Sequence, residues 1–246
     1  MPRFFVRKDQ IADGIITIKG DDAHHISRAL RMAKGEHITV CDMQLSEYDC
    51  VLEGFSEVVT ARIVETRKMN TEPAYCAHLY QALPKGEKFD IIIQKAVECG
   101  VYDITPFESN RCIVQVKPES EAGKTERRQR IALEAAKQCG RGIIPEVRPT
   151  MNFDSMIKEA KKSDLVLFCY EGDGTIPLRQ IMSQRKNTET IRDIAVIIGS
   201  EGGFSLDEAE KAVRAGAIPS GLGKRILRTE TAGAFVLSCL VYEFEL

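Results

Sequence analysis

Residues 193–208 read DIAVIIGSEGGFSLDE and contain the three parts of one strand–loop–helix unit. An apolar strand is predicted over 193–198. Three glycines follow within the next five residues, which permits a left-handed backbone and a close approach to a ligand. Ser205-Leu-Asp-Glu208 then has the spacing of a capping box, which begins a helix that Gly216 closes. Units of this kind build parallel α/β sheets.

The chain after Pro73 repeats this alternation of strands and helices. Apolar residues between Phe89 and Val97 recur at helical spacing, and Gly100 ends that helix. Further strands are predicted over 74–83, 102–107 and 165–170, and further helices over 124–139 and 231–244. The sequence therefore predicts an α/β domain with a parallel sheet covered on both faces.

The first 72 residues have a different pattern. Residues 37–43 and 57–66 alternate between apolar and polar side chains, as half-buried strands do, and 21–32 has the pattern of a short capped helix. The polar segment 68–73 resembles a linker. A length of 246 residues agrees with two domains. We expect a small β-rich domain at 1–72 and an α/β domain at 73–246.

The composition is that of a globular protein, with 43% hydrophobic residues, 28% charged residues and a net charge of −2. This balance excludes a strongly cationic nucleic-acid binder but is compatible with a local basic face. The eight cysteines form no CxxC pair, and the four histidines are not near them at zinc spacing. We therefore expect no metal site and no disulfide framework. Without an apolar run of roughly 20 residues or a signal-peptide core, we expect a cytoplasmic protein with no membrane contact.

Several familiar motifs fail when their spacing is tested. Gly123-Lys-Thr125 lacks the first glycine of a phosphate loop, because Pro118 occupies that position. The segments 172–177 and 221–226 lack the third glycine of the dinucleotide pattern. Ser200 lacks the flanking glycine of a nucleophile elbow, because residue 198 is Ile.

Two loops remain as the candidate site. The first is 198–204, and the second is LGKRILRTETA, residues 222–232, which puts Lys224, Arg225 and Arg228 directly before an apolar helix. Tight turns alone would account for the glycines of both loops. They would not account for the charged side chains that lie between the glycine of the second loop and the apolar helix. Loops at the carboxyl ends of parallel strands are where open α/β sheets bind ligands.

Both loops resemble the signature loops of the SPOUT methyltransferases, and more specifically those of the ribosomal RNA small subunit methyltransferase E family. Other segments that are similar to this family spread over nearly the whole chain, at 25–32, 85–90, 94–101, 106–112 and 134–141. One position departs from the pattern, because Ser200 stands where the family usually has proline. The serine removes a rigid backbone restraint beside the expected cofactor.

The resemblance implies an α/β SPOUT domain with a deep trefoil knot, a small N-terminal PUA-like RNA-binding β-barrel, and a homodimer. It implies S-adenosylmethionine as the cofactor, bent inside the knotted loops. The implied reaction is methylation of N3 of one uridine in the decoding region of 16S ribosomal RNA, in the 30S subunit. The residues expected to bind the cofactor are Ile198, Gly199, Glu201, Gly202, Gly203, Leu222, Gly223, Ile226, Leu227 and Thr229.

The implied chemistry needs a cation and a proton acceptor. Uracil N3 is a poor nucleophile until its proton leaves, and a nearby cation would stabilise the developing anion. Arg228 is the first candidate for this cation and Lys95 the second, although Arg228 could instead pair with Glu230 or the helix end. Glu230, Glu98 and Glu201 are all open as the carboxylate that accepts the proton.

Basic residues are concentrated in two regions. Residues 111–148 hold nine Lys or Arg against five Glu, an excess that suits phosphate contacts, although a solvated helix face would account for part of it. A second group lies within the first 34 residues. The residues expected to bind RNA are Arg3, Arg28, Arg31, Lys85, Arg111 and Arg141.

Two other functions compete with methyl transfer. One is an α/β enzyme that binds a nucleotide phosphate with the same glycine loops. Binding of S-adenosylhomocysteine without binding of NAD or ATP would exclude it. The other is an RNA-binding or assembly factor with an inactive cofactor pocket, and the retained loop residues Gly199, Glu201 and Arg228 argue against it.

Overall fold

The computed structural model describes residues 1–116, 118–185 and 191–246. They form two compact units, one made of 1–72 and 136–144, the other of 73–135 and 145–246. Among the described residues, none of the helices combines the length and apolar character that a membrane span requires.

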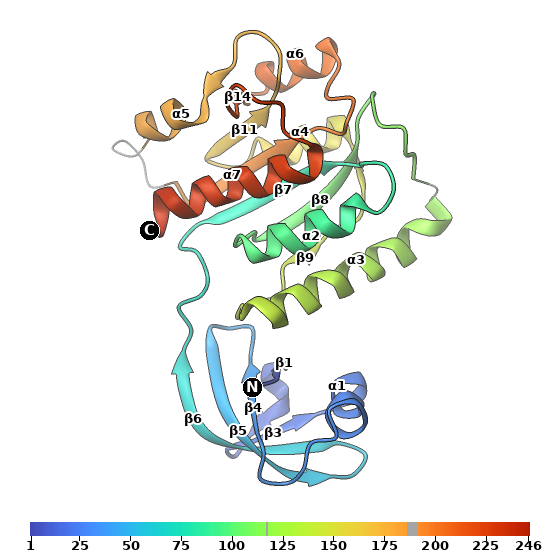
Figure 1. Ribbon diagram of the computed structural model, residues 1–246, viewed down its shortest axis with the longest axis vertical. Coiled ribbons are helices and arrows are strands. Elements are labelled where there is room, and N and C mark those ends of the chain that lie inside the picture. Colours follow the sequence, from blue (N-terminus) through green and yellow to red (C-terminus); the bar gives the residue numbers. More distant parts are fainter. Residues whose placement is uncertain (117, 186–190) are drawn as a thin grey trace. The chain divides into compact units, whose positions relative to one another are not determined.

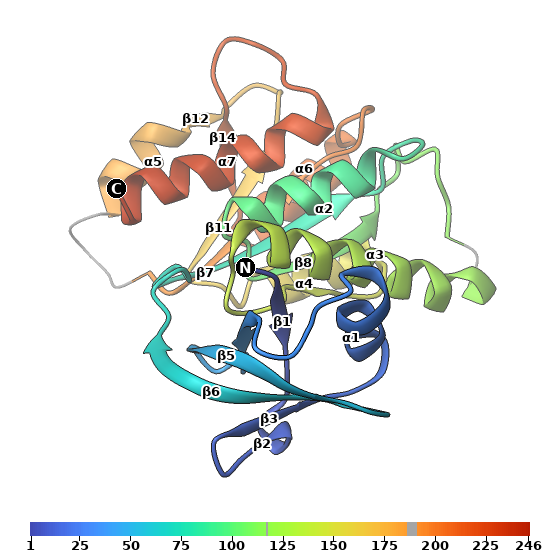
Figure 2. The ribbon, with the colours of Figure 1, turned by 60° about the horizontal axis from the view of Figure 1, so that its bottom comes forward.

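The first unit is built on a six-stranded sheet with the order β1-β4-β5-β6-β3-β2. The β1–β4 pair is parallel and the other pairs are antiparallel, and Figure 2 shows the long strands β5 and β6 curving alongside each other. The alternation predicted at 37–43 and 57–66 appears as β4 and β6. The strands are β1 (Arg3–Phe5), β2 (Ile11–Ala12), β3 (Ile15–Ile18), β4 (His37–Cys41), β5 (Ser46–Phe55) and β6 (Val59–Lys68).

The helix predicted at 21–32 is shorter and less regular than its pattern suggests. It consists of α1 (Gly20–His24) followed by a single π-helical turn, His25–Ala29. The amide of Leu30 donates to the carbonyl of His25, five residues back, at 2.9 Å. Ile26 is buried whereas Leu30 is 40% exposed, so the apolar pair that suggested a longer helix does not share one buried face.

Residues 136–144, which the sequence analysis grouped with the α/β domain, pack within the first unit. The ammonium of Lys137 pairs with Asp22 at 3.0 Å. Nε of Arg141 donates to Glu72 at 3.0 Å, and the amide of Gly142 donates to the same carboxylate at 2.7 Å. Ion pairs between residues far apart in sequence therefore join this segment to residues 1–72.

The second unit contains a sheet in which every strand pair is parallel, with the order β10-β8-β7-β13-β11-β14-β12 and β9 beside β8. The strands are β7 (Cys76–Ala82), β8 (Asp103–Glu108), β9 (Glu146–Val147), β10 (Met151–Asn152), β11 (Leu165–Cys169), β12 (Ile176–Pro177), β13 (Asp193–Ile198) and β14 (Ile218–Gly221). The helices are α2 (Lys88–Glu98), α3 (Pro118–Cys139), α4 (Phe153–Ala160), α5 (Leu178–Arg185), α6 (Leu206–Arg214) and α7 (Thr229–Phe244).

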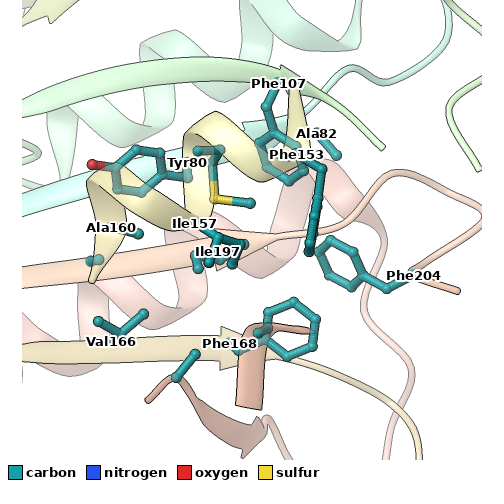
Figure 3. Packing of buried hydrophobic residues seen from close by; sticks show 14 of the residues in the cluster. Tyr80, Ala82, Phe107, Phe153, Ile157, Ala160, Val166, Phe168, Ile197 and Phe204 are labelled. Carbon is teal, nitrogen blue, oxygen red and sulfur yellow. The ribbon is translucent and has the colours of Figure 1, made fainter. Parts of the chain in front are cut away.

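Helices cover both faces of this sheet, which confirms the predicted parallel α/β architecture. On one face, α2 and α7 lie side by side, and α7 contacts β7 and β13 (Figure 1). On the other face, α4 and α6 enclose an apolar cluster that includes Phe107, Phe168 and Ile197 (Figure 3). Because both faces are buried, the central strands carry continuous apolar runs.

Most predicted elements of this unit are present with shifted ends. Strand β13 has the predicted bounds, and the Ser205–Glu208 capping box forms both of its reciprocal bonds at the start of α6. Helix α3 begins at Pro118, six residues before its predicted start. Helices α4 and α5 were not predicted, although α4 has the helical repeat Phe153, Met156, Ile157 and Ala160; each helix is only eight residues long, so its signal covers two turns.

A charged cluster lies at the amino ends of the central strands. Nδ1 of His78 lies 3.0 Å from Asp103, and Nε2 lies 3.2 Å from Asp193. Arg148 also donates to Asp103, at 2.8 Å, and the Tyr102 ring packs edge-on against the imidazole. Since both carboxylates can only accept, both ring nitrogens must donate, so this geometry belongs to the protonated imidazolium. Burial alone lowers the pKa of His78, but the bonds and charges of the two aspartates outweigh it and raise the pKa.

We expect His78 to make folding stability depend on pH. Because its pKa is raised in the folded state, its contribution is fully present below the unfolded pKa of about 6.5 and is lost as pH rises through the folded value. His78→Gln should therefore lower the free energy of unfolding most at about pH 6, with the deficit shrinking towards about pH 9. Urea unfolding across this range measures the deficit, with the exposed His24→Gln as the control. A deficit that is constant with pH would contradict the assignment.

Candidate active site

The two loops predicted to form the site meet where β13 and β14 end. They border a cavity of about 710 Å³, a size typical of small-molecule sites. Cys169 at the end of β11 also lines the cavity, with Tyr170, Glu171, Gly172 and Thr175 from the loop that follows. All ten residues expected to bind the cofactor lie in its lining: Ile198, Gly199, Glu201, Gly202, Gly203, Leu222, Gly223, Ile226, Leu227 and Thr229.

Hydrogen bonds under the cavity join the two loops. The hydroxyl of Thr229, the first residue of α7, donates to the carbonyl of Gly199 at 2.6 Å. Nε2 of Gln81 donates to Oγ1 of Thr229 at 2.9 Å and lies 3.4 Å from the Gly199 carbonyl. Gln81 is completely buried near the carboxyl end of β7. One buried amide therefore fixes the position of both loops.

The first loop turns tightly and is anchored in the core. The amide of Gly203 donates to the carbonyl of Ser200 at 2.9 Å, and Gly203 has φ +64°, in the left-handed region that favours glycine. A Cβ on Gly203 would meet no atom within 4 Å, so space is open beside it. The next residue, Phe204, packs against Phe168 in the apolar cluster, with 4.4 Å between the two ring centroids (Figure 3).

A second segment, 109–112, supports this loop from outside. The amide of Asn110 donates to Glu208 at 2.8 Å, and the Arg111 guanidinium donates to the carbonyl of Gly202 at 3.0 Å. The Ser200 hydroxyl lies 3.5 Å from the carbonyl of Arg111. A Cβ on Gly202 would lie 3.0 Å from Cβ of Arg111, so glycine lets the two segments pack closely. These contacts restrain the loop at Ser200, where the sequence resemblance led us to expect a less rigid backbone.

The predicted cation Arg228 and carboxylate Glu230 lie together. Arg228 is the N-cap residue of α7, lines the cavity and has an 83% exposed side chain. Its guanidinium lies 4.0 Å from Oε1 of Glu230, whose side chain is only 18% exposed. Oε2 of Glu230 is buried and has no hydrogen-bond partner among the described residues.

The other two candidate carboxylates are engaged by lysines. Lys95 pairs with Glu98 at 2.8 Å on an exposed part of α2, and neither residue lines the cavity. The structure therefore does not bring Lys95, the second predicted cation, to the cavity. Lys88 lines the cavity instead and pairs with Glu201 at 2.7 Å. Burial tends to raise the pKa of Glu201, but the bonds from Lys88 and from the amide of Lys85 outweigh it, so the pKa is lowered.

A thiol also borders the cavity but is not poised as a nucleophile. Burial raises the pKa of Cys169 to about 12, so the sulfur stays protonated at neutral pH. No group of three or more metal-ligating side chains occurs among the residues that the structure describes.

The residues expected to bind RNA fall into two classes. Arg111 is exposed and lines the cavity, and Lys85, Arg28 and Arg31 are exposed elsewhere. Arg141, in contrast, is 4% exposed and paired with Glu72, so the expected RNA contact is replaced by a structural ion pair. Arg3 is partly buried, with its guanidinium 2.6 Å from Glu47.

Sequence reasoning missed Gln81 and Lys88. Gln81 is a buried polar residue next to the last residue of β7, a pattern that marks a buried polar role. Lys88 lies in the segment 85–90 that matches the family, but its spacing on the helix does not distinguish it from Lys95.

Comparisons with known proteins agree with this geometry. The profile of the family described as RNA methyltransferase domain matches residues 71–241. The ribosomal RNA small subunit methyltransferase E of Bacillus subtilis (strain 168) is 31% identical, over 100% of this chain and 98% of the relative. The protein of the same name from Mesomycoplasma hyopneumoniae (strain 232) is 33% identical, over 97% of this chain and 98% of the relative.

Solved structures agree as well. The crystal structure of a ribosomal RNA small subunit methyltransferase E from Neisseria gonorrhoeae, bound to S-adenosyl methionine, superposes with a TM-score of 0.85. It is 27% identical, and the match covers 98% of this chain and 97% of that one. Family profile, full-length relatives and fold thus agree, and the chain belongs to the ribosomal RNA small subunit methyltransferase E family.

Proposed function

We propose that the protein transfers a methyl group from S-adenosylmethionine to N3 of one uridine in the decoding region of 16S ribosomal RNA. The observation that carries this proposal is the cavity between the two loops, with Arg228 at its edge and the half-buried Glu230 beside Arg228. Such a substrate would place the enzyme in the cytoplasm, acting on the 30S subunit or its precursor.

S-adenosylmethionine is the cofactor, and the cavity fits it. Ile198, Leu222 and Leu227 supply apolar walls for the adenine and methionine parts, while the loop backbones offer hydrogen-bonding groups. The open space beside Gly203 allows the backbone a close approach. When bound, the cofactor supplies an electrophilic methyl group for an in-line displacement, so positioning is a large part of the catalytic task.

The loop residues would prepare the uracil for this displacement. Arg228, exposed at the start of α7, would lie against the base and stabilise the negative charge that develops when N3 loses its proton. Of the three candidate carboxylates, Glu230 is the proton acceptor that the contacts favour. Its Oε2 has no hydrogen-bond partner among the described residues and lies 3.7 Å from the ammonium of Lys88, whereas lysines hold Glu201 and Glu98 at hydrogen-bonding distance.

We propose that residues 1–72 form the PUA-like RNA-binding domain that the resemblance implies, beside a methyltransferase domain at 73–246. The mostly antiparallel six-stranded sheet of the first unit supports this, as do the exposed side chains of Arg28 and Arg31. Arg111 and Lys85 are the proposed RNA contacts of the second unit, and Arg111 lies at the cavity itself. RNA affinity should then fall with salt concentration, as phosphate contacts require.

We also propose the deep trefoil knot and the homodimer. The knot is what the family resemblance implies, and the bond between Thr229 and Gly199 joins the two loops that would take part in it. A groove of about 1150 Å³ beside α5 and α7 supports the homodimer. Phe235, Tyr242 and Leu246 line this groove with exposed apolar surface, and Tyr242 is 72% exposed. Exposed apolar patches of this kind mark protein contacts.

The reaction itself can be tested with 30S subunits from cells that lack an endogenous enzyme of this kind. Incubation with the protein and S-adenosylmethionine should produce 3-methyluridine in 16S ribosomal RNA, identified by mass spectrometry of its nucleosides. Calorimetry should detect binding of S-adenosylhomocysteine, but not of NAD or ATP. Methylation of another base, or binding of NAD or ATP instead, would refute the proposal.

The cofactor cavity can be tested at Gly203. Asparagine tolerates the left-handed backbone there at a cost of about 1 kcal/mol, but its side chain would project into the open space. Gly203→Asn should weaken S-adenosylhomocysteine binding by about tenfold or more, since overfilling a site costs on the order of 1–3 kcal/mol. Gly20→Asn is the matched control, because Gly20 has φ +66°, equally open space and no place in the cavity lining. Equal affinities in the two folded variants would contradict the cavity assignment.

The role of Arg228 can be tested by single-turnover methylation of 30S subunits. Arg228→Ala should lower the rate by about 100- to 1000-fold, the scale found when one charge-stabilising donor is removed, with RNA affinity changed much less. Arg228→Lys should restore only part of the rate, because an ammonium does not reproduce the planar guanidinium. The alanine variant should regain activity at higher pH, where hydroxide assists deprotonation of N3. A variant with weakened RNA binding but the wild-type single-turnover rate would limit Arg228 to binding RNA.

A further inference from the structure

Lys88 connects parts of the site that come from three separate segments. It is the first residue of α2, outside both loops, yet its side chain lines the cavity. Its ammonium lies 2.7 Å from Oε1 of Glu201 in the first loop and 3.7 Å from Oε2 of Glu230 at the start of α7. One positive charge therefore lies between two carboxylates that belong to different loops.

The two carboxylates depend on this charge to different degrees. Glu201 also accepts from the amide of Lys85, at 3.3 Å. Glu230 has less support, because its Oε2 is buried without a hydrogen bond among the described residues and the Arg228 guanidinium lies 4.0 Å from its other oxygen. In the described part of the chain, Lys88 is the cation that lies within 4 Å of Oε2.

We propose that Lys88 is a positioning residue for methyl transfer, which holds Glu201 and Glu230 at a fixed separation. Through Glu201 it keeps the first loop at the spacing that the cofactor needs, and through Glu230 it orients the proposed proton acceptor. This inference rests on the proposed function. Lys88 acts here through the two glutamates and does not itself take part in the transfer.

The physical basis is repulsion between like charges in a partly enclosed site. Without the ammonium, two negative carboxylates would face each other where water screens them incompletely, and that repulsion would drive the first loop away from α7. The bond between Thr229 and Gly199 crosses the same boundary and would be strained. The effect should follow the charge of Lys88, because its methylene stem can be replaced by another long side chain.

The experiment compares Lys88→Met, which keeps the stem and removes the charge, with Lys211→Met. Lys211 pairs with Asp154 at 2.9 Å and does not line the cavity, so it is a matched control. Calorimetry with S-adenosylhomocysteine should show about tenfold weaker binding for Lys88→Met, the loss expected when about 1.4 kcal/mol of interaction is removed. Lys211→Met should bind as the wild type does, and thermal unfolding shows whether each variant is folded.

Two further variants separate charge from packing. Lys88→Arg should retain most of the affinity and of the single-turnover methylation rate, because it keeps the positive charge. In the double variant Lys88→Met/Glu201→Gln the repulsion is absent, so it should bind S-adenosylhomocysteine nearly as well as Glu201→Gln alone. This comparison holds even if Lys88→Met alone unfolds.

Wild-type activity distinguishes the two proposals. If the wild type neither binds S-adenosylhomocysteine nor methylates 30S subunits, the proposed function itself fails. If the wild type is active and Lys88→Met binds and methylates as well as Lys211→Met, only the role of Lys88 is overturned. A double variant no better than Lys88→Met would also overturn it, because repulsion would not be the cause of the loss.

Discussion

The arrangement of the site depends on the hydrogen bond from the Thr229 hydroxyl to the Gly199 carbonyl, with the amide of Gln81 beneath it. This bond links the end of β13 to the start of α7, two points 30 residues apart in the chain. Gln81 is fully buried, where an unpaired N–H would be costly, so the bonds of its Nε2 restrict both loops to one geometry. Gly203 can face open space because this contact, together with the close packing of Gly202 against Arg111, holds the loop in place.

Much of the fold could be predicted from local pattern. The bounds of β13 follow from its apolar run, and the start of α6 follows from the capping box at Ser205 and Glu208, because both signals lie within a few residues of the element they define. The ten cofactor candidates could be identified because parallel strands bring their carboxyl ends to one edge of a sheet. Residues far apart in the sequence then meet without any long-range signal.

Sequence reasoning was incomplete where a residue's surroundings depend on tertiary contacts. Lys88 and Lys95 occupy the same helix in family-matching segments, and only the loop geometry shows that Lys88 lies at the cavity. In the sequence Arg141 resembles a basic surface residue, but its guanidinium pairs with Glu72, which lies 69 residues earlier. Strand β5 was missed because, on the buried side of its pattern, only Cys50 and Leu52 are fully covered. Tertiary pairing determines these roles, and one sequence does not display it.

The amino and carboxyl ends of the parallel strands have separate roles. The ion cluster around His78 lies at the amino ends of the strands and the cavity at the carboxyl ends, so the six residues of β13 separate them by on the order of 15 Å. Groups this far apart that share no partners affect stability and binding almost additively. Substitutions at the amino ends can therefore change the stability of the fold and its pH dependence while the affinity of the cavity stays nearly constant.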